Sequence, residues 1–216
     1  MNLTGKNVLF LGDSITEGVG VSSKEKRYTD VFKSISGANV YNYGISGTRI
    51  ARQKRPSSEP RFDLCFLDRV SEMEEQADVV VVFGGTNDFG HGDASFGCFA
   101  DRDEYTYYGA LHSLVNRIIN RYPKATVVFI TPLHRTGENI LVNEIDLPRY
   151  PLKKYVDAML EVCEHYSIPV LDLYKISGLQ PEIEVIRNTY MPDGLHPSDM
   201  GAEIIAKRLY GFLTTL

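Results

Sequence analysis

The stretch NVLFLGDSITEGVG, residues 7–20, decides how the rest of the chain is interpreted. It passes from an apolar run that ends at Gly12 directly into Asp13 and Ser14, followed by further turn-forming residues. The apolar run predicts a buried strand, and the polar residues predict a tight exit from it. Such a polar tip can be a phosphate cradle, an ordinary turn or a nucleophile, and the rest of the sequence has to distinguish these alternatives.

Short apolar runs alternate with longer helical patterns along the chain. The strand candidates cover residues 7–12, 39–44, 78–85, 125–132 and 168–174. The helix candidates lie near residues 28–36, 63–77, 105–121, 151–166 and 198–214. Strands that are apolar on both faces belong in a parallel sheet with helices on each side. We therefore predict a single α/β domain over residues 1–216, a three-layer α/β/α fold with a five-stranded parallel sheet in the flavodoxin-like order 2-1-3-4-5.

Composition and charge exclude several classes of protein. A hydrophobic content of 43% is enough for a core, and the net charge of −5 gives no electrostatic support for nucleic-acid binding. No apolar run is long enough to span a membrane. The start, MNLTGKNVLF, lacks the features of a signal peptide, so we expect a cytoplasmic protein. Three widely spaced cysteines without a CxxC pair argue against structural zinc and a disulfide framework: Cys65, Cys98 and Cys163.

Polar or glycine residues follow every predicted strand. In order, the exits read GDS (12–14), NYGISG (42–47), GGTND (84–88), TPLHR (131–135) and, after the last strand, MPDGLHP (191–197). Ligands of open parallel sheets bind outside the carboxyl ends of the strands. We therefore expect these five segments to converge on one edge of the sheet.

The phosphate-cradle interpretation finds no support in the glycine spacing. The pattern GxxxxGK[ST] is absent, and Gly18 and Gly20, which are followed by Ser23, lie too far past the strand for a GxGxxG fingerprint. We expect no nucleotide cofactor.

The nucleophile interpretation needs a base and a group that orients the base. His196 and Asp193 lie three residues apart in DGLHP. If this loop turns tightly, the carboxylate reaches one imidazole nitrogen while the other faces Ser14. On its own, the pair favours a turn followed by a helix cap.

A developing oxyanion also needs hydrogen-bond donors. Gly44 has no side chain to obstruct its backbone N–H, and Asn87 offers a neutral side-chain amide. Each residue alone is consistent with a turn. Their joint occurrence with Ser14 and His196, all at strand exits of one sheet, favours an active site.

At this point the sequence resembles the SGNH hydrolases, also known as GDSL-type lipases, esterases and acylhydrolases. The four blocks of that family occur here in order, as GDSITEG, NYGISG, GGTND and DGLHP, and the resemblance covers nearly the whole chain. It implies a triad of Ser14 as nucleophile, His196 as general base and acid, and Asp193 as its orienting partner. It also implies an oxyanion hole formed by the backbone N–H groups of Ser14 and Gly44 and the side chain of Asn87, without metal or cofactor.

Other polar residues near the strand exits receive lesser roles. Asp13 and Asp88 are expected to hold loops by hydrogen bonds. His134 is the only other candidate base, but we see no carboxylate at short spacing, so we expect a substrate contact or a surface histidine. His91 and Asp93 lack a third ligand and favour a glycine-rich loop over a metal site.

Three loops can reach Ser14: residues 45–61, 89–108 and 132–150. The tyrosines of residues 105–108 either pack a helix or line a sugar-binding surface. The basic segment 49–61 is either a solvated loop or a contact for an anionic substrate.

Taken together, these features predict a serine esterase that transfers an acyl group to Ser14 and then hydrolyses the acyl-enzyme. The expected partner is a small ester, with a short acyl group such as an O-acetyl group on a sugar. Thioesterase and acyltransferase activities are alternatives with the same acyl-enzyme. The rival from another class is a non-catalytic, flavodoxin-like ligand-binding module.

Overall fold

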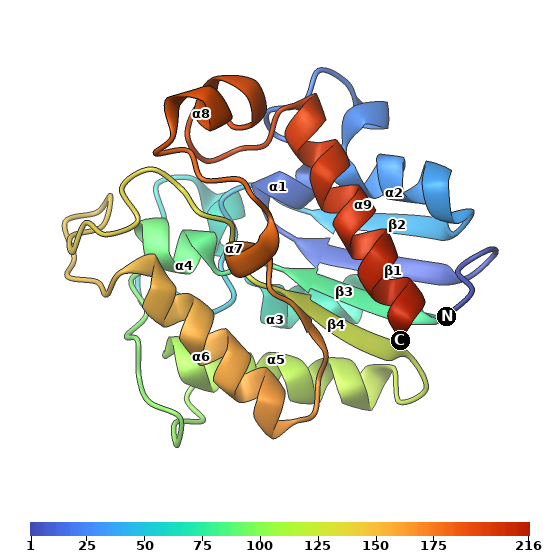
Figure 1. The fold of residues 1–216 in the computed structure, drawn as a ribbon. Helices are drawn as coiled ribbons and strands as arrows, with labels where there is room; N and C mark the ends of the chain where they lie inside the picture. The colour runs from blue at the N-terminus through green and yellow to red at the C-terminus, as the bar shows by residue number, and fades with distance from the viewer.

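A central parallel sheet between two layers of helices forms the protein, and the computed structural model describes all of residues 1–216 (Figure 1). The strands are β1 (Asn7–Gly12), β2 (Asn39–Gly44), β3 (Val79–Phe83), β4 (Thr126–Ile130) and β5 (Val170–Leu171). Their order in the sheet is β2-β1-β3-β4-β5, with every neighbouring pair parallel. The predicted fold class and strand order are confirmed.

The helices match the prediction at four of the five long patterns. The α-helices are α1 (Ser14–Glu17), α2 (Tyr28–Ser36), α3 (Phe66–Arg69), α4 (Thr86–His91), α5 (Tyr107–Arg121), α6 (Leu152–His165), α7 (Leu173–Ile176), α8 (Glu184–Tyr190) and α9 (Asp199–Thr215). Single 3₁₀ turns are η1 (Lys24–Lys26), η2 (Pro60–Asp63) and η3 (Val70–Glu72).

The predicted continuous helix over 63–77 is wrong. Only α3 and the two 3₁₀ turns η2 and η3 form in this part of the chain, and Cys65 before α3 has an extended backbone with ψ 156°. The Phe66 N–H donates to the Arg49 carbonyl oxygen at 3.0 Å, and Arg69 donates to carbonyl groups at the strand ends. These long-range bonds compete with the bonds of a longer helix and hold the segment against the sheet.

Alternate residues of each strand enter two separate cores, one on each face of the sheet. Leu9 and Leu11 of β1 pack in the core that α3, α5 and α6 cover. Val8 and Phe10 pack in the core that α2 and α9 cover. This alternation follows from the two-residue period of a strand, and it explains why the strands are apolar on both faces.

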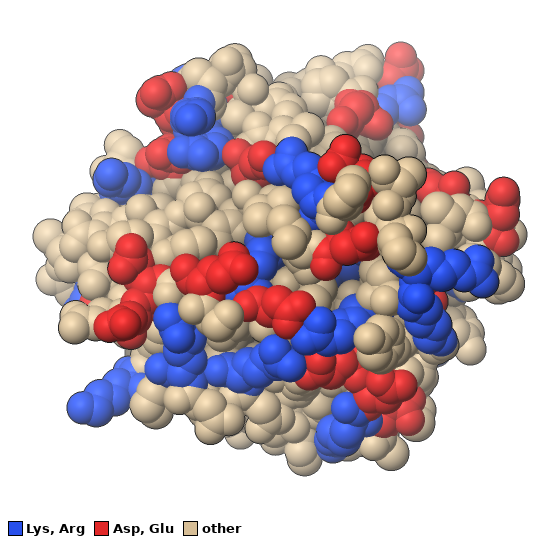
Figure 2. All heavy atoms as spheres, turned by 180° about the vertical axis from the view of Figure 1, so that it is seen from behind, with Lys and Arg blue, Asp and Glu red and all other residues tan.

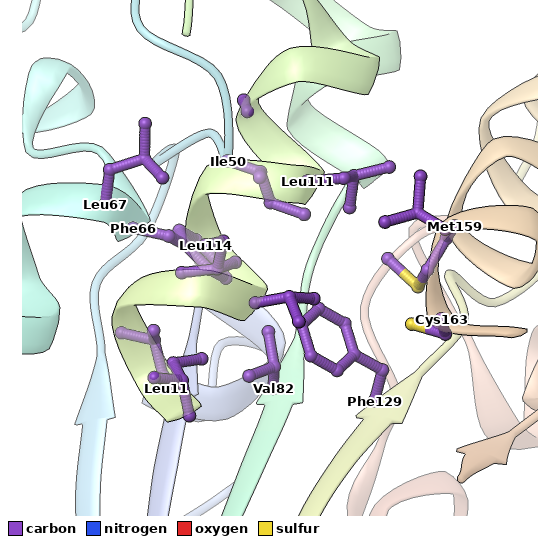
Figure 3. Packing of buried hydrophobic residues seen from close by; sticks show 14 of the residues in the cluster. Leu11, Ile50, Phe66, Leu67, Val82, Leu111, Leu114, Phe129, Met159 and Cys163 are labelled. Atoms are coloured by element: carbon purple, nitrogen blue, oxygen red, sulfur yellow. The ribbon is translucent and has the colours of Figure 1, made fainter. Parts of the chain in front are cut away.

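Figure 3 shows the first of these cores from close by. Val82 and Phe129 of the sheet meet Leu111 and Leu114 of α5, and Met159 approaches from α6. All five side chains are fully buried. Replacing such a leucine by alanine costs about 2–5 kcal/mol of stability. The packing of this layer therefore holds the helices firmly against the sheet, and with them the loops at its carboxyl edge.

The carboxyl edge of the sheet carries short helices that begin directly at strand exits. α1 starts two residues after β1 ends, and α4 starts three residues after β3 ends. None of the helices combines the length and the apolar character that crossing a membrane requires. On the face drawn in Figure 2, basic and acidic side chains lie beside one another, so that neither sign forms a broad patch.

Candidate active site

Ser14 is the first residue of α1, immediately past the end of β1. Asp13 caps this short helix, because its carboxylate accepts the Ile15 N–H at 3.0 Å. The backbone N–H of Ser14 has no acceptor, as expected for the first turn of a helix. The strand exit therefore presents a serine hydroxyl together with a free N–H.

His196 and Asp193 meet Ser14 from the turn between α8 and α9. The His196 Nε2 lies 2.9 Å from the Ser14 Oγ, and the His196 Nδ1 lies 2.6 Å from the Asp193 Oδ2. The other carboxylate oxygen of Asp193 accepts the backbone N–H groups of Leu195 at 2.9 Å and His196 at 2.7 Å. Gly194, at φ +78°, allows the turn that brings these groups together.

The carboxylate of Asp193 is stabilised in its charged form. Partial burial raises its pKa, but the hydrogen bonds from the His196 N–H and imidazole outweigh burial, and the pKa falls below its usual value. Asp193 is therefore ionised at neutral pH. A charged carboxylate on Nδ1 leaves Nε2 as the nitrogen that can accept the proton of Ser14.

Asn87, the second residue of α4, presents its amide at the same edge. One N–H of its Nδ2 donates to the Thr48 carbonyl oxygen at 3.0 Å, which leaves the second N–H without a protein acceptor. The bond to Thr48 fixes the orientation of the amide. Asn87 therefore has one donor available, and its part in an oxyanion hole stays a prediction.

Gly44 does not offer the free N–H that the sequence analysis assigned to it. Its N–H donates to the Asn42 Oδ1 at 2.8 Å. A Cβ at Gly44 would lie 2.1 Å from the Glu17 backbone nitrogen, so this glycine is required for close packing beneath α1. The predicted donor role of Gly44 is therefore wrong, because the neighbouring asparagine already occupies the group.

Gly47, three residues further on, has the free N–H that Gly44 lacks. It adopts φ +75°, and its N–H has no acceptor. The residues on both sides are tied down: the Ser46 N–H donates to the Glu17 carboxylate of α1 at 2.6 Å, and the Thr48 carbonyl accepts from Asn87. Gly47 is therefore held between the helix of Ser14 and the amide of Asn87. The dipeptide Ser-Gly in the sequence is the available signal for such a left-handed turn.

Arg69 is buried and binds the same loops, a role that the sequence did not lead us to predict. Its guanidinium donates to the Tyr43 carbonyl at 2.6 Å, to the Gly12 carbonyl at 3.1 Å and to the Thr48 Oγ1 at 2.9 Å. Burial lowers its pKa to about 10, which still leaves it charged at neutral pH. Arg69 links the end of β1 to both ends of the loop that contains Gly47. The continuous helix predicted for 63–77 gave no reason to place it there.

Asp13 and Asp88 hold loops, which confirms the expectation for both. The two oxygens of Asp88 accept the N–H groups of Ile50 and Ala51, each at 2.9 Å. Burial raises the pKa of Asp13 to about 7 and the pKa of Asp88 to about 6. Asp88 thereby joins the α4 exit to the loop that follows β2.

His134 has a carboxylate partner that the sequence analysis did not recognise. Its Nδ1 lies 2.9 Å from the Glu138 Oε2, four residues along, and its ring lies 3.8 Å from that of Tyr174. The statement that it lacks a carboxylate at short spacing is wrong, because a non-helical loop folds back between the two residues. His196 nevertheless is the histidine that contacts Ser14.

The remaining candidates serve the structure. His91 lies 2.9 Å from the Arg49 guanidinium, while Asp93 accepts the N–H groups of Lys54 and Arg55, so the two residues have separate partners.

The tyrosines at the start of α5 pack the helix. Tyr107 is buried against Tyr155, and the Tyr108 hydroxyl donates to Glu161 of α6. Of the two interpretations of residues 105–108, packing therefore describes Tyr107 and Tyr108.

A three-layer α/β/α fold with a Ser–His–Asp triad at the carboxyl edge of its sheet is typical of a serine hydrolase. The family model described as GDSL-like Lipase/Acylhydrolase matches residues 10–204. The chain belongs to this family, and it is an ester hydrolase.

Solved structures agree with this assignment. One crystal structure shares 36% sequence identity, with 100% of this chain and 99% of the other covered and a TM-score of 0.86. A protein from Lactobacillus plantarum shares 29% identity over 99% and 98% of the chains, with a TM-score of 0.83. An acetyl xylan esterase shares the fold at 23% identity over 95% and 98% of the chains, with a TM-score of 0.67. No curated protein sequence matches significantly.

Proposed function

We propose that this protein is a serine esterase that cleaves short-chain acyl esters through an acyl-enzyme on Ser14. The observation that carries the proposal is the unbroken chain of contacts from the Ser14 Oγ to the His196 Nε2 and from the His196 Nδ1 to the Asp193 carboxylate. A serine becomes a nucleophile when a positioned base takes its proton, and the base works when a third group fixes its tautomer.

The reaction divides into two steps. In the first, Ser14 attacks the ester carbonyl while His196 takes the hydroxyl proton and then gives it to the departing alcohol oxygen. In the second, His196 takes a proton from water as the water oxygen attacks the acyl-enzyme. It then returns that proton to the Ser14 Oγ as the bond between Oγ and the acyl carbon breaks and the carboxylic acid leaves. Asp193 stabilises the imidazolium that forms in both steps.

The oxyanion of each step is assigned to three donors: the N–H groups of Ser14 and Gly47 and the free N–H of Asn87. The N–H of Gly44 is excluded because it is already bonded to Asn42. Amide NMR of glycine-labelled protein after phosphonylation of Ser14 tests this assignment. The Gly47 amide should move downfield while that of Gly44 stays in place, whereas the opposite pattern would restore Gly44 as the donor.

The substrate we propose is a small ester with a short acyl group. A hollow of about 450 Å³ beside this site has only 3 hydrophobic residues among the 12 that line it, which suits a polar alcohol part of the ester such as a sugar. The same fold serves an acetyl xylan esterase, so acetyl groups on sugars are compatible with it.

A series of p-nitrophenyl esters from acetate to palmitate tests the acyl length. We expect the highest kcat/KM for acetate or butyrate and a steep fall beyond about four carbons, because each misplaced methylene costs about 1–3 kcal/mol. A maximum at about eight carbons or more would contradict the short-acyl proposal and leave the role of Ser14 untouched.

A further inference from the structure

A hollow of about 450 Å³ opens beside the loop that contains Gly47. Apart from Phe62, its lining residues belong to three loops, residues 45–61, 89–108 and 132–150. The Phe62 ring, which lies in its wall, is so close to Gly47 that a Cβ there would approach it to 2.0 Å. The hollow therefore borders the proposed oxyanion site without containing Ser14 or His196.

Helix α4 fixes the spacing between this hollow and the reacting centre. His91 lines the hollow and Asn87 lies four residues earlier on the same helix. Side chains at this spacing lie on the same helix face, about 5–6 Å apart at their Cβ atoms. If the carbonyl oxygen of an ester lies at Asn87, the rest of the ester needs to extend by only about one helical turn, the distance from Asn87 to His91, to enter the hollow.

A second hollow of about 290 Å³ continues from the first. The two share Asp93 and Leu147 in their walls. The second one ends at aromatic side chains: Tyr150 is 52% exposed, and its ring centroid lies 4.8 Å from that of Phe96. An exposed tyrosine face beside a hollow offers both an apolar surface and a hydroxyl.

The polar groups of the first hollow are balanced in charge. Arg49 and Arg55 supply two positive charges, and Asp93 and Glu144 supply two negative ones. Burial, with a contribution from the Arg49 guanidinium, lowers the pKa of His91 to about 4, so this histidine is neutral near pH 7. A balanced set of donors and acceptors favours a neutral, hydroxyl-rich ligand over an anion.

Arg49 also leaves a donor unused. Its side chain is 2% exposed and donates to Ser57 and Asp63, both at 2.7 Å, yet its Nε has no acceptor. The guanidinium in the wall of the hollow therefore keeps unused donor capacity.

We propose that the two hollows form one groove, which binds the carbohydrate part of the ester over at least two sugar rings. The first ring lies against Phe62 and Arg49, and the next ring stacks on Tyr150. The assignment rests on the proposed function, because it is Ser14 that would release the acyl group from the sugar held there.

Three substrates separate the groove from the chemistry: p-nitrophenyl acetate, acetylated xylose and acetylated xylotriose. Tyr150→Ala should raise KM for acetylated xylotriose about 3- to 10-fold and leave the other two substrates unchanged, because only the longer sugar reaches this ring. Ser58→Trp, at an exposed residue of the first hollow, should raise KM for both sugars and leave p-nitrophenyl acetate unchanged. Ile183→Ala, at a side chain 53% exposed and away from both hollows, is the control matched in exposure and should change nothing.

Binding of unmodified xylotriose to the Ser14→Ala variant, measured by calorimetry, tests the groove independently of turnover. We expect binding that Tyr150→Ala weakens. Equal KM changes for all three substrates, unchanged KM for xylotriose in Tyr150→Ala, or tighter binding of trigalacturonate than of xylotriose would overturn the proposal. Loss of p-nitrophenyl acetate hydrolysis in the unmodified enzyme would instead overturn the proposed function, with the binding measurement still deciding the groove.

Discussion

The turn at residues 193–196 and the loop at residues 44–48 both serve the same site, but they are built differently. In the turn, Asp193 and His196 bond to each other and to the backbone between them. In the loop, several fixed groups depend on distant residues, among them Glu17, Arg69 and Asn87, beside local bonds such as that from Gly44 to Asn42. A short local spacing therefore specifies the first region, whereas the second takes its shape from the rest of the fold.

This difference explains what the sequence could reveal. The Asp-x-x-His spacing predicted the base and its partner once it was considered together with the segments of Ser14, Gly44 and Asn87. The free glycine N–H of the loop could not be identified in the same way, since Gly44 and Gly47 are equivalent in the sequence until the acceptor of each N–H is known. The bond from Gly44 to Asn42 and the left-handed backbone of Gly47 distinguish them in the structure.

The largest expected effect concerns the locally encoded turn. His196→Ala should lower kcat by roughly four to six orders of magnitude, because the nucleophile loses its base. Steady-state kinetics on p-nitrophenyl acetate measure the loss, and circular dichroism checks that the fold is intact. His134→Ala is the matched control, and a comparable loss there would make His134 the base.

A smaller effect is expected at Asn87, whose amide is assigned to the oxyanion in the proposed function. Asn87→Ala should lower kcat by about 10²–10³ with little change in KM, because the donor acts on charge present only in the transition state. Asn116→Ala, on α5, is the control, because the Asn116 amide donates only to the His112 carbonyl oxygen and the Tyr166 hydroxyl. A change confined to KM would show that Asn87 binds substrate in its ground state.

Substitution of Arg69, which touches no reacting atom, should disturb the loop at residues 44–48. Arg69→Lys removes the forked donor that links Gly12, Tyr43 and Thr48, so kcat should fall about 10- to 100-fold through misplaced donors, with KM little changed. Arg121→Lys, whose guanidinium donates to the Met73 carbonyl, is the control. Equal loss of activity and of thermal stability in both variants would reduce Arg69 to an ordinary structural residue.

The smallest effect is on stability and depends on pH. Burial raises the pKa of Asp13 to about 7 from 3.8, so the folded protein keeps a proton that the unfolded chain releases. The associated stabilisation is complete below about pH 4 and is lost as the pH rises through 7. The Tm of Asp13→Asn relative to the unmodified protein should therefore rise by about 2–6 °C between pH 5 and pH 8. A constant difference across this range would show that Asp13 is charged throughout.

The fold followed from the sequence more completely than the site did. Apolar runs such as that of residues 7–12 predict strands from a pattern along the chain, and right-handed crossovers limit the orders in which these strands can be connected. Residues 63–77 carry a helical pattern but form α3 between two 3₁₀ turns, because their polar groups bond to loops far away in the sequence. The partner of His134 was missed for a related reason, since the contact with Glu138 arises in an irregular loop.

Covalent labelling of Ser14 tests the central claim most directly. The protein is treated with diisopropyl fluorophosphate, and its intact mass, the modified peptide and the residual activity are measured together. We predict one adduct, located on Ser14, with loss of esterase activity in proportion to labelling and no adduct in Ser14→Ala. Ester hydrolysis that persists in fully labelled protein or in Ser14→Ala would contradict the account, and a protein with neither label nor turnover would be the non-catalytic binding module.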